Sequence, residues 1–67
     1  MSLLAKRIKE LRIEKKAKQM DIADYLGVNP RAIRFYESGD REPNVDTLIK
    51  LADFFDVSVD YLIGREK

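Results

Sequence analysis

Apolar residues recur every three or four positions along most of the chain, a spacing typical of amphipathic helices rather than strands. The pattern predicts five short helices, at about residues 2–16, 19–26 and 30–38, then from 45 and from 59 onward. The side chains expected in the core lie on the inward faces of these helices: Leu4, Ile8, Leu11, Ile22, Ala23, Leu26, Ala32, Ile33, Tyr36, Val45, Leu48, Leu51, Ala52, Phe55, Val57, Tyr61 and Leu62. No strand pattern competes, so the predicted fold class is all-α.

Capping and turn residues mark where these helices begin and end. Gly27 follows the second, as expected of a residue that tolerates the left-handed conformation after a last turn. Asn29 and Pro30 begin the third, because asparagine is a preferred N-cap and proline loses nothing there by lacking an N–H. Gly39 ends the third helix, and Pro43 lies in the loop that follows. Further cap candidates precede the other helices: Ser2, Asn44 and Ser58.

The composition narrows both the organisation and the function. At 67 residues the chain is near the lower limit for a domain held by a hydrophobic core alone, so residues 1–67 are predicted to form one domain. It contains no cysteine and no histidine, which removes the commonest metal ligands, thiolates and general bases. We therefore expect no enzyme activity, no metal, no cofactor and no small-molecule ligand. Short apolar runs argue against a membrane span or signal peptide and favour a cytoplasmic protein.

Charge is distributed unevenly, although the formal net charge is only +1. Residues 1–41 hold ten basic and six acidic residues, a net of +4, whereas residues 42–67 hold three and six, a net of −3. A basic part on an otherwise balanced domain suits a surface that binds a polyanion. A solvated helical face gives the same asymmetry, so charge alone does not decide between them.

The segment 30–38 combines two features that suit DNA. It follows the preceding helix after the short turn "GVN", as in a helix-turn-helix unit. At roughly 100° per residue, Arg31, Arg34 and Phe35 share the face opposite the buried side, so Phe35 is expected to point outward. Arginine pairs with guanine O6 and N7, and apolar side chains contact the thymine methyl. The alternatives are a solvated face for the arginines and packing against the first helix or a dimer partner for Phe35.

From about Leu4 to Gly64 the chain resembles the lambda-repressor-like (Xre/Cro) helix-turn-helix family of bacterial and phage regulators. Three stretches carry the resemblance: "IKELRIEKK", "KQMDIADYLGVNPRAIRFYESGDREP" and "TLIKLADFFDVSVDYLIG". It implies a compact five-helix domain whose third helix, about Pro30 to Ser38, lies in the major groove. It also implies a sequence-specific regulator that binds double-stranded DNA, most simply a repressor.

The resemblance assigns roles to individual positions. Those that would read bases or touch sugars are Asn29, Pro30, Arg31, Arg34 and Phe35. Those that would contact phosphates are Lys18, Gln19, Ser38 and Arg41. Lys18 and Gln19 also fall at a helix N-terminus, where free N–H groups favour an anion. Asp40 and Glu42 in the following loop would repel phosphates, which argues against a strong clamp there.

A structural ion pair is also implied by the resemblance. In this family an arginine on the first helix commonly pairs with a glutamate near the end of the third, and Arg12 and Glu37 occupy both positions. The helical wheel places Glu37 at about 340°, between the buried and the outward face, which agrees with a half-buried pair.

Association with a second copy is expected on energetic grounds. Phe54 lies off the apolar stripe of its helix and, with Val59 and Ile63, is a candidate dimer surface, with packing inside the chain as the alternative. A homodimer would read two half-sites about one helical turn apart, hence a palindromic operator. The competing function is an antitoxin or another protein-interaction module with a DNA-binding-type domain. Such proteins usually carry an extra toxin-wrapping segment, so the shortness of the chain argues against this function, unless a longer native chain was cut here.

Overall fold

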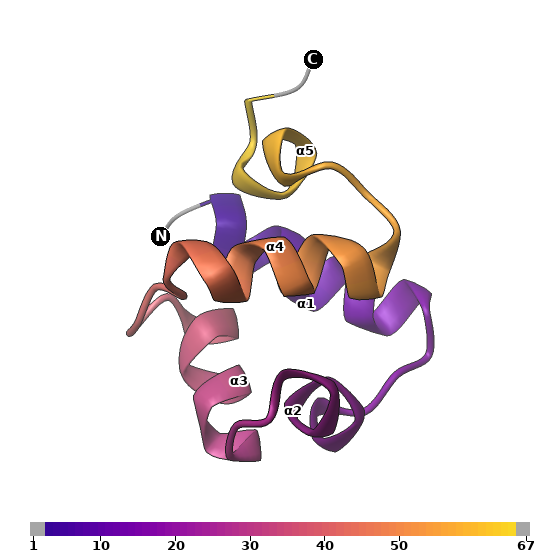
Figure 1. Cartoon of the computed structure of the whole chain (residues 1–67), viewed down its shortest axis with the longest axis vertical. Coiled ribbons are helices and arrows are strands. Elements are labelled where there is room, and N and C mark those ends of the chain that lie inside the picture. The colour runs from indigo at the N-terminus through magenta and orange to yellow at the C-terminus, as the bar shows by residue number, and fades with distance from the viewer. Residues whose placement is uncertain (1–2, 66–67) are drawn as a thin grey trace.

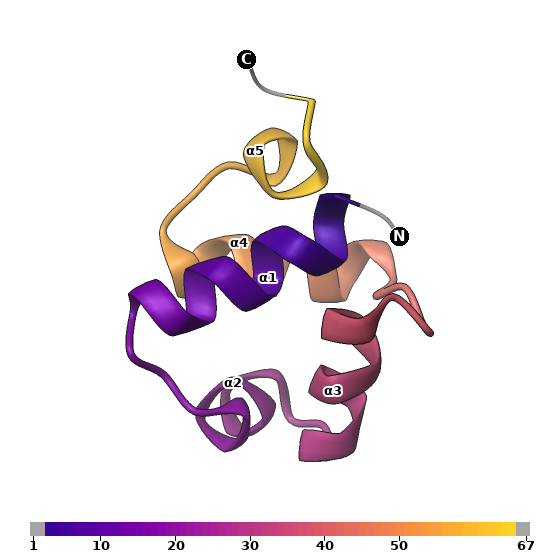
Figure 2. The ribbon, with the colours of Figure 1, turned by 180° about the vertical axis from the view of Figure 1, so that it is seen from behind.

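The computed structural model describes residues 3–65, which contain five α-helices and no strand. The helices are α1 (Leu3–Glu14), α2 (Gln19–Leu26), α3 (Pro30–Ser38), α4 (Val45–Phe55) and α5 (Val59–Ile63). In Figure 1, α1 and α4 cross the middle of the molecule, with α2 and α3 on one side and α5 on the other. Figure 2 shows the same arrangement from behind, with α1 toward the viewer. The all-α prediction is confirmed.

The core takes one fully buried aliphatic side chain from each helix: Ile8, Ile22, Ile33, Leu51 and Leu62. Around them lie further buried apolar residues from three of the helices, α1, α2 and α4: Leu4, Ala5, Ala23, Leu26, Ala52 and Phe55. Fully burying one such large side chain stabilises the fold by about 1.5 to 3 kcal/mol. Because each helix is too short to be stable alone, this shared core fixes the orientation of α2 and α3.

The first helix is shorter than predicted at its C-terminal end. It stops at Glu14, and Lys16 has a left-handed φ of 59°. The Ala17 N–H donates to the Arg12 carbonyl at 3.0 Å, which closes the last turn. Apolar periodicity carries no signal for such a turn, since lysine gives no warning of a left-handed conformation. The predicted cap Ser2 lies outside the described residues.

Two residues predicted in the core are exposed. Val45 is 70% accessible, because it lies at the edge of the α4 stripe, next to the exposed Ile49. Tyr61 is 37% accessible and covers the seam between α5 and α1 instead of entering the core. Its neighbour Leu62 is fully buried, as the turn of about 100° between successive residues requires.

No helix within residues 3–65 is both long and apolar enough to cross a membrane.

Candidate nucleic-acid interface

The turn between α2 and α3 is fixed by its own hydrogen bonds. Gly27 has a φ of 72°, and the Val28 N–H donates to the Ala23 carbonyl at 3.0 Å, which closes the end of α2. The Asn29 side-chain oxygen accepts from the Arg31 N–H at 2.9 Å, and Pro30 occupies the first helical position. The sequence signals for this turn therefore correspond to observed caps, and they set α3 at a defined angle to α2.

The two faces of α3 separate as the helical wheel predicts, with one modification. Ile33 is buried, whereas Arg31 and Arg34 are exposed. Asn29 and Pro30 are exposed at the N-terminal end of the same face. The Asn29 oxygen is committed to its cap, which leaves the amide N–H groups as its free donors.

The modification concerns Phe35, which is half-buried rather than fully exposed. The Arg41 guanidinium carbon lies 4.8 Å from the centre of the Phe35 ring. The loop turns back over α3 to make this contact, because the N–H groups of Gly39 and Arg41 both donate to the Phe35 carbonyl, at 3.1 and 3.3 Å. An arginine stacked on an aromatic ring keeps its in-plane donors free, so Arg41 remains able to bind a phosphate.

Ser38 makes its hydrogen bonds inside the chain. Its hydroxyl lies 2.9 Å from an Asp40 carboxylate oxygen and 3.1 Å from the Phe35 carbonyl, and it accepts from the Asp40 N–H at 3.3 Å. A hydroxyl has one hydrogen to donate. A phosphate at Ser38 would therefore compete with Asp40 for that hydrogen.

Arg12 and Glu37 are brought together across α1 and α3. Arg12 Nε donates to Glu37 Oε2 at 2.6 Å and Nη2 to Oε1 at 3.2 Å, a bidentate geometry. Arg12 Nη1 also donates to the Ala17 carbonyl at 3.2 Å. The side chains are only 18% and 6% accessible. Arg12 thus joins α1, the α1–α2 loop and the last turn of α3.

Gln19 extends this network to α2. Its Nε2 donates to Glu37 Oε1 at 3.3 Å, so the first residue of α2 contacts the last turn of α3. Lys18, directly before it, is exposed, and its backbone N–H donates to the Asp21 carboxylate at 2.8 Å. The Lys18 side chain is therefore on the surface, at the N-terminal end of α2.

The predicted dimer residues are partly covered within the chain. The Phe54 ring makes edge contacts with Tyr25 and Phe55, at 5.2 and 5.3 Å between ring centres. Val59 and Ile63 pack partly against the core. Tyr25 itself is 52% accessible. Aromatic packing inside the chain therefore covers part of the Phe54 ring, and apolar periodicity carries no signal for its contact with Tyr25.

A helix-turn-helix family model matches residues 8–62. The chain belongs to the lambda-repressor-like helix-turn-helix family. This confirms the resemblance read from the sequence. Members of this family are DNA-binding domains of transcriptional regulators and not enzymes.

Three similar proteins place the domain among regulators. It is 41% identical over 64 residues to the uncharacterised regulator YqaE of Bacillus subtilis, covering 96% of this chain and 55% of that one. It is 38% identical over 47 residues to the phage CTXphi repressor RstR of Vibrio cholerae, covering 70% and 42%. The P22 c2 repressor, solved in complex with a synthetic operator, matches with a TM-score of 0.89 and 30% identity over 98% of this domain and all of that chain.

The helix-turn-helix domain spans about half the length of the curated relatives it matches.

Proposed function

We propose that this chain is the reading domain of a transcriptional regulator, most simply a repressor, that binds a palindromic operator as a homodimer. The observation that carries the proposal is the outward face of α3, which presents Arg31, Arg34 and part of Phe35 beside one another. The match to a repressor that was solved on its operator supports it. Residues 1–67 would act as a single DNA-binding unit. Regulation would follow from occupancy of a promoter in the cytoplasm of a prokaryotic cell.

The mechanism assigns reading and positioning to different parts of the fold. Inserted in the major groove, α3 would contact bases or sugars through Asn29, Pro30, Arg31, Arg34 and Phe35. Phosphates would be held by Lys18, Gln19 and Arg41, with Ser38 contributing only after it releases Asp40. The Glu37 contacts to Arg12 and Gln19 would keep α3 from tilting while it reads.

Dimerisation would supply affinity that one domain lacks. A single module making a few phosphate contacts binds non-specifically at about 10⁻⁴ to 10⁻⁶ M, whereas two modules on adjacent half-sites read a longer sequence. Phe54, Val59 and Ile63 are the proposed contact surface. Sedimentation that finds one chain per site, both free and on DNA, would contradict the dimer without contradicting DNA binding.

The test of the function is selection of bound duplexes from a random pool. We expect enrichment of a symmetric sequence whose half-sites lie about one helical turn apart. No enrichment over non-specific binding at about 0.15 M salt would reject operator recognition and favour the interaction-module alternative.

On the selected site, Arg31→Ala and Arg34→Ala should each weaken binding by about 1 to 3 kcal/mol and relax the preference at one base position. The measurement is the dissociation constant on the selected site and on each single-base variant of it. Lys18→Ala is the matched comparison, because a lost phosphate contact weakens all sequences alike. If both arginine variants lost equal affinity for the selected and the random duplexes, Arg31 and Arg34 would not be base contacts.

A further inference from the structure

A small hollow lies between α1, the start of α2 and the end of α3. It is open to solvent, has a volume of about 200 Å³ and is lined by five polar side chains: Lys9, Gln19, Arg34, Glu37 and Ser38. Four of these already have a predicted role in reading, phosphate contact or the ion pair. Lys9 does not, because apolar periodicity places it on the solvent side of α1. The sequence signal for Lys9 is its spacing of three residues from Arg12. Residues three apart lie on the same face of a helix, so Lys9 lies on the face from which Arg12 contacts α3.

The charged side chains around the hollow differ in whether they already form an ion pair. The Glu37 carboxylate forms one wall, but Arg12 neutralises it through two hydrogen bonds, at 2.6 and 3.2 Å. Lys9 and Arg34 form no ion pair within residues 3–65. Two uncompensated cations therefore border the hollow, and the negative charge beside them is cancelled from the other side.

The remaining donors also suit an oxyanion. An amide nitrogen has two N–H groups, and Gln19 uses one of them on Glu37 at 3.3 Å. Lysine offers three donors and arginine five. With a volume of about 200 Å³, the hollow is several times larger than the roughly 30 Å³ share of one water molecule, so a phosphate group that keeps part of its hydration fits. The charge, the hydrogen-bond donors and the size of the hollow thus all favour the same class of ligand, an oxyanion such as a phosphate.

We propose that this hollow is a seat for one phosphate of the DNA backbone and that Lys9 holds it. The inference rests on the proposed function, because α3 must lie in the groove for a backbone phosphate to reach its flank. The seat borders Arg34 and the Arg12–Glu37–Gln19 network, so a phosphate there would fix the register of the recognition helix. Such a contact is independent of base sequence and strengthens as salt is lowered.

The test compares Lys9→Gln with Lys50→Gln on a selected operator and on a random duplex of equal length, between 0.05 and 0.2 M salt. Both residues are exposed lysines within helices, and both substitutions remove one positive charge, but Lys50 lies on α4, away from the hollow. One lost phosphate contact lowers the salt slope by about 0.9. It should weaken binding about five-fold at 0.15 M salt, equally on both duplexes. Lys9→Arg should retain the slope, and thermal melts should show all three variants folded.

Three results would overturn the inference. A Lys9→Gln slope and affinity equal to those of Lys50→Gln would show that Lys9 holds no phosphate. A loss confined to the operator would make Lys9 a base contact instead. Absence of duplex binding by the unsubstituted chain, even at 0.05 M salt, would reject the proposed function and this inference with it. The first two results leave the proposed function standing.

Discussion

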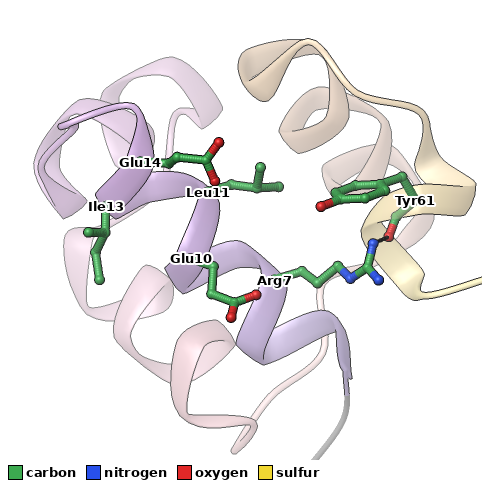
Figure 3. A pocket seen from close by; sticks show the side chains of 6 residues that line it. All are labelled: Arg7, Glu10, Leu11, Ile13, Glu14 and Tyr61. Atoms are coloured by element: carbon green, nitrogen blue, oxygen red, sulfur yellow. Dashed lines mark hydrogen bonds between the residues drawn. The ribbon is translucent and has the colours of Figure 1, made fainter.

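Two arginines of α1 attach this helix to opposite ends of the molecule. Arg12 forms a largely buried, bidentate ion pair with Glu37 on α3, at 2.6 and 3.2 Å. Arg7 contacts Tyr61 on α5 without any carboxylate: its guanidinium carbon lies 4.0 Å from the ring centre, and Nη1 donates to the Tyr61 carbonyl at 2.8 Å. Figure 3 shows this second contact among the side chains that line a pocket between α1 and α5. The pocket has a volume of about 420 Å³.

The two contacts differ in the free energy that the fold loses when each of them is broken. A buried carboxylate or guanidinium without its partner keeps a charge that water cannot reach, which costs several kcal/mol. An exposed cation over an aromatic ring returns to water when the ring is removed, and such a contact contributes about 0.5 to 1 kcal/mol. The end of α1 near α3 is therefore expected to be rigidly specified, and the end near α5 only loosely so.

The largest effect should come from Glu37→Ala. It leaves the Arg12 charge without a carboxylate and removes the partner of Gln19. We expect a loss of about 3 kcal/mol, at the low end for buried pairs because Arg12 is 18% accessible. For a chain of this size each kcal/mol lowers Tm by about 4 to 8 °C, so a melt followed by circular dichroism measures it.

Two controls separate charge burial from simple loss of contact. Glu42→Ala removes an exposed carboxylate from the next loop and should change the free energy of unfolding by less than about 0.5 kcal/mol. The double variant Arg12→Met with Glu37→Leu removes both charges and should recover much of the stability lost by Glu37→Ala. A loss of about 3 kcal/mol would lower Tm by far more than 1 °C. A Tm of Glu37→Ala within 1 °C of that of the unsubstituted chain would therefore show that the pair is unimportant to stability.

An intermediate effect is expected at Gly64, where α5 meets the start of α1. Gly64 has a φ of 85°, and a Cβ added there would overlap the Leu3 side chain. Gly64→Ala should therefore cost about 2 kcal/mol, from the left-handed conformation together with displacement of Leu3.

Gly27→Ala is the matched control, because Gly27 has a φ of 72° and nothing within 4 Å of the added Cβ. It should show the conformational cost alone, about 1 kcal/mol. Chemical denaturation of both variants gives the two free energies of unfolding. Equal losses would mean that the Leu3 side chain moves aside without cost and that its overlap with the added Cβ does not destabilise the fold.

The sequence predicts the fold best where a residue has a local reason for its conformation. Helix ends with a dedicated residue were readable, since Gly27, Asn29 and Gly39 each have a local reason to be there. The end of α1 was not, because Lys16 takes a left-handed φ of 59° without any such reason in its side chain. Val45 was misplaced because a stripe of apolar residues does not show where its edge meets solvent.

The candidate site was predictable where it depends on one helix and not where it depends on a loop. The exposed positions of Arg31 and Arg34 follow from helical geometry. The stacking of Arg41 on Phe35 depends on the path of the chain after Gly39, which periodicity does not encode. The position of Lys9 and Arg34 at the border of one hollow likewise requires the packing of α1 against α3.

The smallest effect is expected from Arg7→Ala, on the exposed side of the comparison. It removes the contact with the Tyr61 ring and the hydrogen bond to its carbonyl. We expect a loss of about 1 kcal/mol or less, because the ring and the carbonyl become hydrated instead of being left buried. Lys6→Ala is the matched control in the same denaturation experiment, because Lys6 directly precedes Arg7 on α1 and is exposed. If Arg7→Ala cost as much as Glu37→Ala, burial of charge would not be what distinguishes the two ends of α1.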